Sequence, residues 1–318
     1  MKIVVVGGGS WGTAFAALLR DRDHDVTLAC RDPEQVRAIE ETGHNPRYLT
    51  TADLRGVNPV TVENAPIAET ELIVLAVPSR AFAGVAEALP GDAPVLILTK
   101  GLDPGTGSRL STRVQDRPVA VLSGPNMAEE IAEGLPTASV IASEDGVLAG
   151  RLQHALNSSL FRAYVNPDLV GVELCAAAKN VIALAAGGVD GLGLGDNAKA
   201  SLIARGLAEM ARLGEAAGAR AETFAGLAGI GDLVVTCWSR HGRNRHAGEL
   251  IAQGLTPERA VAEIGQTVEG LTTAPILRDL SHRLGVELPI TEGVCAVLSG
   301  QSITDLAAGL MGREPTEE

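Results

Sequence analysis

The composition of this 318-residue chain indicates a globular protein with room for two domains, because 46% of its residues are hydrophobic. Its formal net charge of −13 argues against nucleic-acid binding, since no basic stripe is available to neutralise phosphates. The four cysteines form no C-x-x-C pair and the six histidines show no H-E-x-x-H spacing. We therefore predict no metal and no disulfide, and a reducing compartment, the cytoplasm.

No stretch of the chain approaches 18 uncharged apolar residues, so we expect no integral membrane association. The apolar start is interrupted by three glycines, which argues against a signal peptide. Residues 2–6 are instead predicted to form a buried strand, and residues 10–20 a helix that follows the glycine turn. The next predicted strands are 25–30, 59–62, 72–77, 94–98, 118–122, 137–142 and 161–165, and the helices between them are 33–42, 79–89, 126–133 and 146–157.

This alternation predicts an α/β domain with a doubly wound, mostly parallel sheet over residues 1–166. After Asn166 the pattern becomes helical, beginning at Pro167 and the capping residue Asp168. Residues 167–318 are therefore predicted to form an all-α domain, and residues 312–318 a frayed tail. The predicted helices of this domain are 168–186, 197–217, 220–226, 231–238, 242–253, 257–264, 272–283 and 291–300.

Lysine is rare in this chain, with only Lys2, Lys100, Lys179 and Lys199 among 26 Lys and Arg residues. A desolvated lysine can exchange a proton near neutral pH, whereas arginine stays protonated. Lys179 lies on one apolar helical stripe with Val172, Cys175, Ala176, Ile182 and Ala183, which points to a chemical role. A lysine that covers apolar surface and keeps its ammonium in water is the alternative.

A dinucleotide-binding turn is predicted at residues 7–12, where G-x-G-x-x-G follows a strand and opens a helix. Gly7 would allow the tight turn, Gly9 would admit a pyrophosphate and Gly12 would let helix and strand pack closely. Arg31 directly follows the second predicted strand and precedes Asp32, an order that favours the 2′-phosphate of NADPH, with NAD tolerated. A ligand-free turn and a merely solvated Arg31 are the alternatives.

Further candidates for a ligand site follow predicted strands or open helices. Lys100 ends a strand at the expected carboxyl edge of the sheet, and the turn at Gly124 and Asn126 follows the next strand. Asp232 opens a helix and is a plausible partner for a buried Lys179, or only a helix cap. Residues 243–245 (Arg-Asn-Arg) are either a phosphate clamp or a solvated charged face.

These segments together resemble the bacterial biosynthetic type of NAD(P)-dependent glycerol-3-phosphate dehydrogenase over nearly the whole chain. The resemblance rests on GGGSWGTA at the start, LTKGL at 98–102, SGPNMAEE at 123–130, the long segment 173–206, AGIGDLVVTC at 228–237, GRNR at 242–245 and TVEG at 267–270. It implies a Rossmann-like domain followed by an all-helical substrate domain, often in a homodimer.

The resemblance also implies reduction of dihydroxyacetone phosphate to sn-glycerol 3-phosphate for phospholipid synthesis, with Lys179 as the general acid/base. The substrate-binding residues that it implies are Lys100, Gly124, Asn126, Lys179, Asp232, Gly242, Arg243 and Asn244. The cofactor-binding residues, including those of the glycine turn, are Gly7, Gly9, Ser10, Trp11, Gly12, Arg31, Tyr48, Lys100, Ala128, Arg243, Thr267 and Glu269.

Three positions depart from the family pattern. Gly242 replaces a common Ser, Asn126 a Ser or Thr, and Thr267 a common Val, so a contact at Gly242 must come from the backbone. We expect structural roles for Lys2 and for Lys199, the latter at a helix start. Two rival functions remain open at this stage: a dehydrogenase acting on a carboxylate substrate, and a non-catalytic NADPH-binding sensor.

Overall fold

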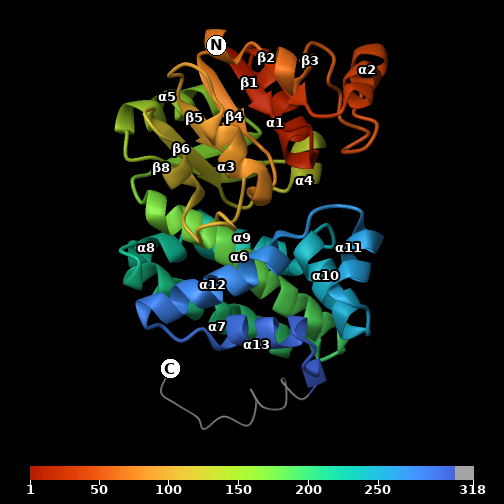
Figure 1. Ribbon diagram of the computed structural model, residues 1–318, viewed down its shortest axis with the longest axis vertical. Helices are drawn as coiled ribbons and strands as arrows, with labels where there is room; N and C mark the ends of the chain where they lie inside the picture. The colour runs from red at the N-terminus through yellow and green to blue at the C-terminus, as the bar shows by residue number, and fades with distance from the viewer. Residues whose placement is uncertain (305–318) are drawn as a thin grey trace.

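The computed structural model describes residues 1–304 and divides into a sheet half and a helical half, which lie one above the other in Figure 1. The predicted frayed tail at residues 312–318 lies outside the described residues. The sheet half holds eight strands in the order β3-β2-β1-β4-β5-β6-β7-β8. Their bounds are β1 Lys2–Val6, β2 Asp25–Cys30, β3 Asn58–Thr61, β4 Leu72–Leu75, β5 Val95–Ile97, β6 Val119–Ser123, β7 Thr137–Ala142 and β8 Phe161–Asn166.

The first six strands are parallel, and β7 is antiparallel to β6 but parallel to β8. Five helices accompany them: α1 Ser10–Arg20, α2 Pro33–Thr42, α3 Ser79–Glu87, α4 Ala128–Ala132 and α5 Gly146–Leu156. Alternate residues of β1 belong to different apolar clusters, because successive strand side chains point to opposite faces. The cluster of Ile3 and Val5 includes side chains of α1, α2 and α5, and that of Val4 and Val6 includes side chains of α3. The predicted doubly wound fold is confirmed.

The helical half is built around α6, Leu169–Gly191. Its other helices are α7 Gly195–Ala216, α8 Ala221–Phe224, α9 Asp232–Trp238, α10 Arg243–Ala252, α11 Pro257–Ile264, α12 Glu269–Leu284 and α13 Pro289–Leu298. Glycines bring α6 and α10 together, since a methyl group on Gly187 or Gly248 would overlap the backbone of the facing helix. These close approaches explain why α6 continues past Gly187 to Gly191, five residues beyond the predicted end at 186.

Helix α6 is apolar and long enough to cross a membrane by length and composition, but 89% of its apolar window is buried inside the protein. Among the described residues it is the one helix that meets this criterion. The apolar stripe predicted for Lys179 is buried as expected, and the other faces of α6 are buried as well, because α6 is the central helix of this half. Lys179 is therefore enclosed by protein rather than placed at the margin of an amphipathic face.

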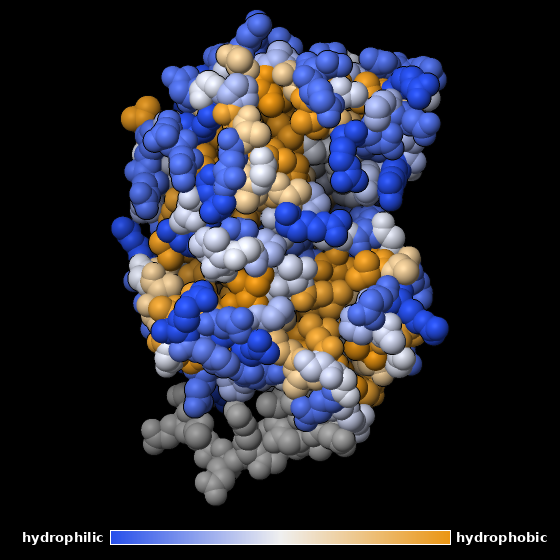
Figure 2. Space-filling model, in the orientation of Figure 1, coloured by the Kyte–Doolittle hydropathy of each residue, from blue (hydrophilic) through white to orange (hydrophobic). Residues whose placement is uncertain are grey.

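Other boundaries shift for local reasons. Helix α4 begins at Ala128, two residues later than predicted, because Gly124 adopts a φ of +133° and Met127 is still extended. Helix α9 is preceded by a π-helical turn over Leu227–Gly231. Figure 2 shows an apolar area on the helical half. This half also contains an apolar cavity of about 100 Å³, which is lined by residues of α6, α7, α10 and α13. Its lining offers no polar side chain for chemistry.

Candidate functional site

The glycine turn between β1 and α1 has the geometry expected of a dinucleotide-binding turn. Gly7 has a φ of +118°, and a methyl group there would lie 2.5 Å from the carbonyl oxygen of Ala76. A methyl group on Gly12 would overlap the carbonyl oxygen of Gly7, so only glycine lets α1 pack this closely on β1. A methyl group on Gly9 would meet nothing within 4 Å. The turn therefore leaves open space at the N-terminus of α1, where an anion is stabilised.

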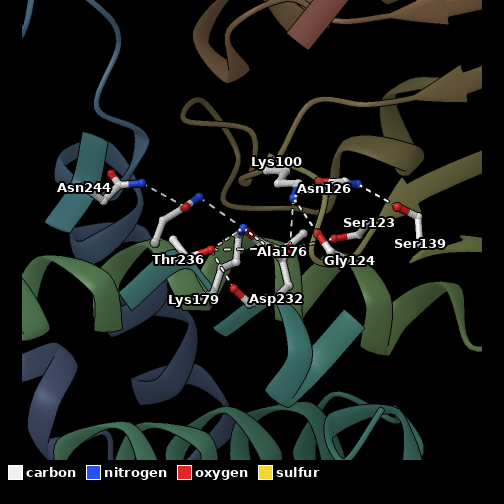
Figure 3. Close-up of polar contacts among 11 residues, drawn as sticks. Lys100, Ser123, Gly124, Asn126, Ser139, Ala176, Lys179, Asp232, Thr236 and Asn244 are labelled. Atoms are coloured by element: carbon white, nitrogen blue, oxygen red, sulfur yellow. Dashed lines mark hydrogen bonds and ion pairs between the residues drawn. The ribbon is translucent and has the colours of Figure 1, made fainter. Parts of the chain in front are cut away.

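Three segments that are far apart in the sequence meet at Asp232 (Figure 3). Lys179 of α6 donates to Asp232 Oδ1 at 2.5 Å, and Lys100, just after β5, donates to Oδ2 at 2.9 Å. The side chain of Asp232 is 1% exposed, that of Lys179 5% and that of Lys100 18%. One buried carboxylate is thus shared by two ammonium groups, and Lys100 is the more accessible of the two. Lys179 does not keep its ammonium in water, so that alternative is wrong.

The environment tunes the proton affinity of this cluster. The pKa of Lys179 is lowered to about 7, mainly by burial and also by the charge of Lys100, while Asp232 opposes the shift. Burial alone raises the pKa of Asp232, but Lys100 and Lys179 outweigh it and hold that pKa below its ordinary value. The cluster therefore combines a permanent carboxylate with an ammonium group that can release and regain a proton near neutral pH.

Side chains around the cluster fix both lysines. Lys100 also donates to Asn126 Oδ1 at 2.8 Å and to the carbonyl of Gly124 at 3.3 Å. Asn126 Nδ2 in turn donates to Ser139 Oγ at 3.2 Å. The departure from Ser or Thr at position 126 thus gives an amide that orients Lys100. Lys179 donates to Thr236 Oγ1 at 2.8 Å, one turn along α9 from Asp232.

The predicted phosphate clamp is divided by the structure. Arg243 is exposed and donates to the carbonyl of Thr267 at 3.1 Å, a contact that does not depend on the side chain at 267. Asn244 is buried and accepts from the Gly270 amide at 2.9 Å. Arg245, in contrast, pairs with Asp190 at 2.7 Å and is tied to the helical core. Of the three residues, Arg243 alone has an exposed side chain, while Asn244 lies buried beside it with its amide bound to Asn180 and Gly270.

Gly242 is buried directly before this pair. A methyl group on Gly242 would lie 2.8 Å from the carbonyl oxygen of Thr236, so a larger residue would push against α9, which carries Asp232. Lys199 lies near the start of α7, as expected, and is buried, where it pairs with Asp190 at 2.8 Å and lies over the Trp238 ring. Lys2 is exposed on β1, in line with its expected structural role.

The residues expected to line the cofactor are distributed around the carboxyl edge of the sheet half. Ser10 and Trp11 open α1, Arg31 is exposed after β2, and Ala128 opens α4. Tyr48 is half-buried, with the Arg47 guanidinium over its ring.

Glu269, at the start of α12, crosses from the helical half to the sheet half. It accepts from the Ser79 amide at 3.1 Å and from Ser79 Oγ at 2.6 Å, and so caps α3. Thr267, two residues earlier, supplies the carbonyl that accepts from Arg243.

Several polar residues of the site were not predicted. Thr236 follows Asp232 by one helical turn, and Asn180 follows Lys179 and accepts from Asn244 Nδ2 at 2.9 Å. An isolated polar residue next to Lys179 in an otherwise apolar helix was the available signal for Asn180. Ser79 had no sequence signal, because its partner is 190 residues away. Within residues 1–304 no group of three His, Cys, Asp or Glu side chains is placed to hold a metal ion.

A glycine turn on β1, an open α1 N-terminus and a buried lysine of lowered pKa at the same sheet edge define an oxidoreductase of the dinucleotide-binding class. Two family models match the chain: the NAD-dependent glycerol-3-phosphate dehydrogenase N-terminus over residues 2–149, and the corresponding C-terminus over residues 168–307. The chain belongs to the NAD(P)-dependent glycerol-3-phosphate dehydrogenase family, which confirms the predicted family and enzyme class.

Relatives cover the full length of the chain. The glycerol-3-phosphate dehydrogenase [NAD(P)+] of Moorella thermoacetica is 45% identical, with 100% of this chain and 97% of the relative aligned. That of Corynebacterium glutamicum (strain R) is 44% identical over 100% of both chains. The crystal structure of the glycerol-3-phosphate dehydrogenase of Coxiella burnetii has a TM-score of 0.94 at 36% identity and covers 98% of this chain and 99% of its own.

Proposed function

We propose that this protein catalyses reversible hydride transfer between NAD(P)H and dihydroxyacetone phosphate, giving sn-glycerol 3-phosphate. The observation that carries the proposal is the buried cluster in which Asp232 holds Lys179 and Lys100 at the carboxyl edge of the sheet. A carbonyl group reduced at this position would develop negative charge on its oxygen. Two ammonium groups beside that oxygen would stabilise the charge in a site with little water.

Lys179 acts as the general acid/base in this proposal. During reduction it transfers a proton from Nζ to the oxygen as the carbonyl carbon receives the hydride, and in the reverse direction it accepts that proton. Its pKa of about 7 lets both directions proceed near neutral pH. Asp232 orients the Lys179 ammonium group and balances its charge, while Lys100 binds the substrate oxygen.

The glycine turn and the N-terminus of α1 would hold the pyrophosphate of the dinucleotide, which supplies or accepts the hydride when bound. Gly9 leaves this region clear of side-chain atoms, so the residues present fit the group. Arg31, exposed after β2, supports a preference for NADPH while NADH is also accepted. Lining residues of this site would be Gly7, Ser10, Trp11, Gly12, Tyr48, Lys100, Ala128, Arg243, Thr267 and Glu269.

The substrate phosphate would bind at the start of α10, on the exposed Arg243 and on Asn244. Gly242 would contribute only backbone contacts, and the turn at Gly124 and Asn126 would line the other side of the substrate. Binding energy from the phosphate holds the carbonyl against the lysines, which favours the transition state.

The division of the chain into a cofactor domain at 1–166 and a substrate domain at 167–318 is part of the same proposal. It is supported by the change from strands to helices after Asn166 and by the placement of the site residues in both halves. We also propose a cytoplasmic homodimer that supplies glycerol 3-phosphate for glycerophospholipid synthesis.

Spectrophotometric oxidation of NADPH and NADH with dihydroxyacetone phosphate tests the proposal directly. We expect turnover with both cofactors and a larger kcat/KM with NADPH. Faster turnover of a panel of 2-oxo and 3-oxo acids would instead favour a carboxylate dehydrogenase. Tight NADPH binding without turnover of any substrate would favour a non-catalytic sensor.

A further inference from the structure

The peptide bond between Gly8 and Gly9 is held on its carbonyl side by two amide side chains. Gln35, in the first turn of α2, donates from Nε2 to the Gly8 oxygen at 2.6 Å. Asn45, beyond the end of α2, donates from Nδ2 to the same oxygen at 3.0 Å. Neither side chain belongs to the glycine motif, yet both bind its backbone. One carbonyl group therefore has two side-chain donors that fix its direction.

Fixing this carbonyl also fixes the next amide. A trans peptide unit is planar, so its C=O and N–H point in opposite directions. The described chain contains no cis peptide bond. The Gly9 N–H is thus turned away from Gln35 and Asn45. Gly9 directly precedes α1, and a methyl group on it would meet nothing within 4 Å. The α-carbon next to this amide is therefore open on its Cβ side, at the N-terminus of α1.

Asn45 is fully buried and uses both ends of its amide group. Nδ2 also donates to Thr13 Oγ1 at 2.8 Å, which ties the turn to α1. Oδ1 accepts from the backbone amides of Arg47 and Tyr48, each at 3.1 Å. The same side chain thus joins the glycine turn to the segment that carries Tyr48.

We infer that Gln35 and Asn45 are positioning residues that aim the Gly9 N–H at the pyrophosphate of the dinucleotide, acting through the Gly8 carbonyl. The inference rests on the proposed function, because it takes a dinucleotide as the ligand of the turn. Gln35 acts on the carbonyl alone, whereas Asn45 also sets the position of Tyr48 relative to the turn.

The variants Gln35→Met, Asn45→Ala and the double variant test this role. Gln35→Met keeps the side-chain length and removes the amide group, and with it the Nε2 donor to Gly8. Loss of one hydrogen bond should raise the Kd for NADPH about 5-fold, and the double variant should raise it about 25-fold. Because both side chains bind the glycine turn and neither is among the proposed substrate-binding residues, kcat at saturating NADPH should stay within about 2-fold of wild type. NADPH fluorescence titration and steady-state kinetics give these values.

Arg20→Met is the matched control. Arg20 donates to the carbonyls of Asp53 and Arg55 at 2.9 and 2.7 Å, and so fastens the far end of the segment that follows α2. This variant should lower Tm without changing the Kd for NADPH. The inference is overturned if the double variant binds NADPH like wild type, or if Arg20→Met weakens binding equally at a matched loss of Tm. Wild-type protein that does not bind NADPH would overturn the proposed function itself.

Discussion

Lys179 and Asp232 are 53 residues apart in the chain and form a buried ion pair with an Nζ to Oδ1 distance of 2.5 Å. Burial of a charged lysine is costly unless a partner and hydrogen bonds compensate for it. Asp232 and Thr236 provide this compensation from one helical face of α9. Desolvation of the ammonium group outweighs its attraction to Asp232, so the pKa of Lys179 is lowered. The acid/base chemistry of the site depends on the balance between these two effects.

Lys179→Ala should lower kcat by roughly 10² to 10⁴-fold, because it removes the proton donor. The Kd for NADPH should change little, since the ammonium group acts on the substrate oxygen. Steady-state kinetics and NADPH titration measure the two effects. Lys2→Ala, at an exposed position on β1, is the control and should behave like wild type. An enzyme that keeps most of its activity without Lys179 would contradict the assignment.

The rate of reduction should depend on pH through Lys179. With a pKa of about 7, the protonated acid is present below pH 7 and declines about tenfold per unit above it, so kcat/KM, which reports on the free enzyme, should fall in the same way. Asp232→Asn removes the charge that raises this pKa and should shift the break in the profile to lower pH. Lys100→Met removes a charge that lowers it and should shift the break to higher pH. Identical breaks in all three proteins would show that another group titrates.

Arg243→Ala should mainly raise the KM for dihydroxyacetone phosphate, by about 10-fold or more for a charge-assisted contact. Arg245→Met is the informative comparison two residues away. Because Arg245 is bound to Asp190 and Glu249, Arg245→Met should lower Tm and leave the KM nearly unchanged. Initial rates and thermal unfolding of both variants separate the two roles. An effect of Arg243→Ala confined to kcat would exclude a phosphate contact.

Arg31→Ala should reduce the ratio of kcat/KM for NADPH over NADH. The guanidinium group is exposed after β2, where it would pair with a 2′-phosphate that NADH lacks. Loss of that ion pair should lower kcat/KM for NADPH about 10-fold and leave kcat/KM for NADH nearly constant. Kinetics with each cofactor at fixed substrate give the ratio. A constant ratio would remove Arg31 from cofactor selection.

Glu209 gives a prediction about stability. Burial raises its pKa from 4.5 to about 7, although it accepts from the amides of Ile290 and Thr291. The folded state therefore keeps a proton that the unfolded chain has released between about pH 4.5 and 7, so stability falls as pH rises through this window. Relative to Glu209→Gln, wild-type Tm should decrease between pH 5 and 8. Thermal unfolding at four pH values tests this, and parallel curves would contradict it.

Local patterns predicted most of the secondary structure, including the bounds of α1, α2, β7 and α11. These elements carry strong start and stop signals, such as the Asp32 cap of α2 and the Thr256 cap of α11. Helix α6 was predicted too short, because glycine lowers helix propensity while packing against α10 overrides it. The start of α4 was missed, since the strained turn at Gly124 depends on β7, whose backbone lies against it.

The sequence by itself determined the glycine turn, the strand and helix on either side of it, and the candidate lysines, because these depend on neighbouring residues and on composition. It also brought Asp232 forward as a partner for Lys179, but left open whether the two side chains touch. Only the tertiary structure showed that one carboxylate holds both Lys179 and Lys100, that Arg245 belongs to the core, and that Glu269 caps α3. Each of these contacts joins segments that no local rule relates, and each forms only once those segments have packed together, within the helical half for Arg245 and Asp190 and between the two halves for Lys100 and Glu269.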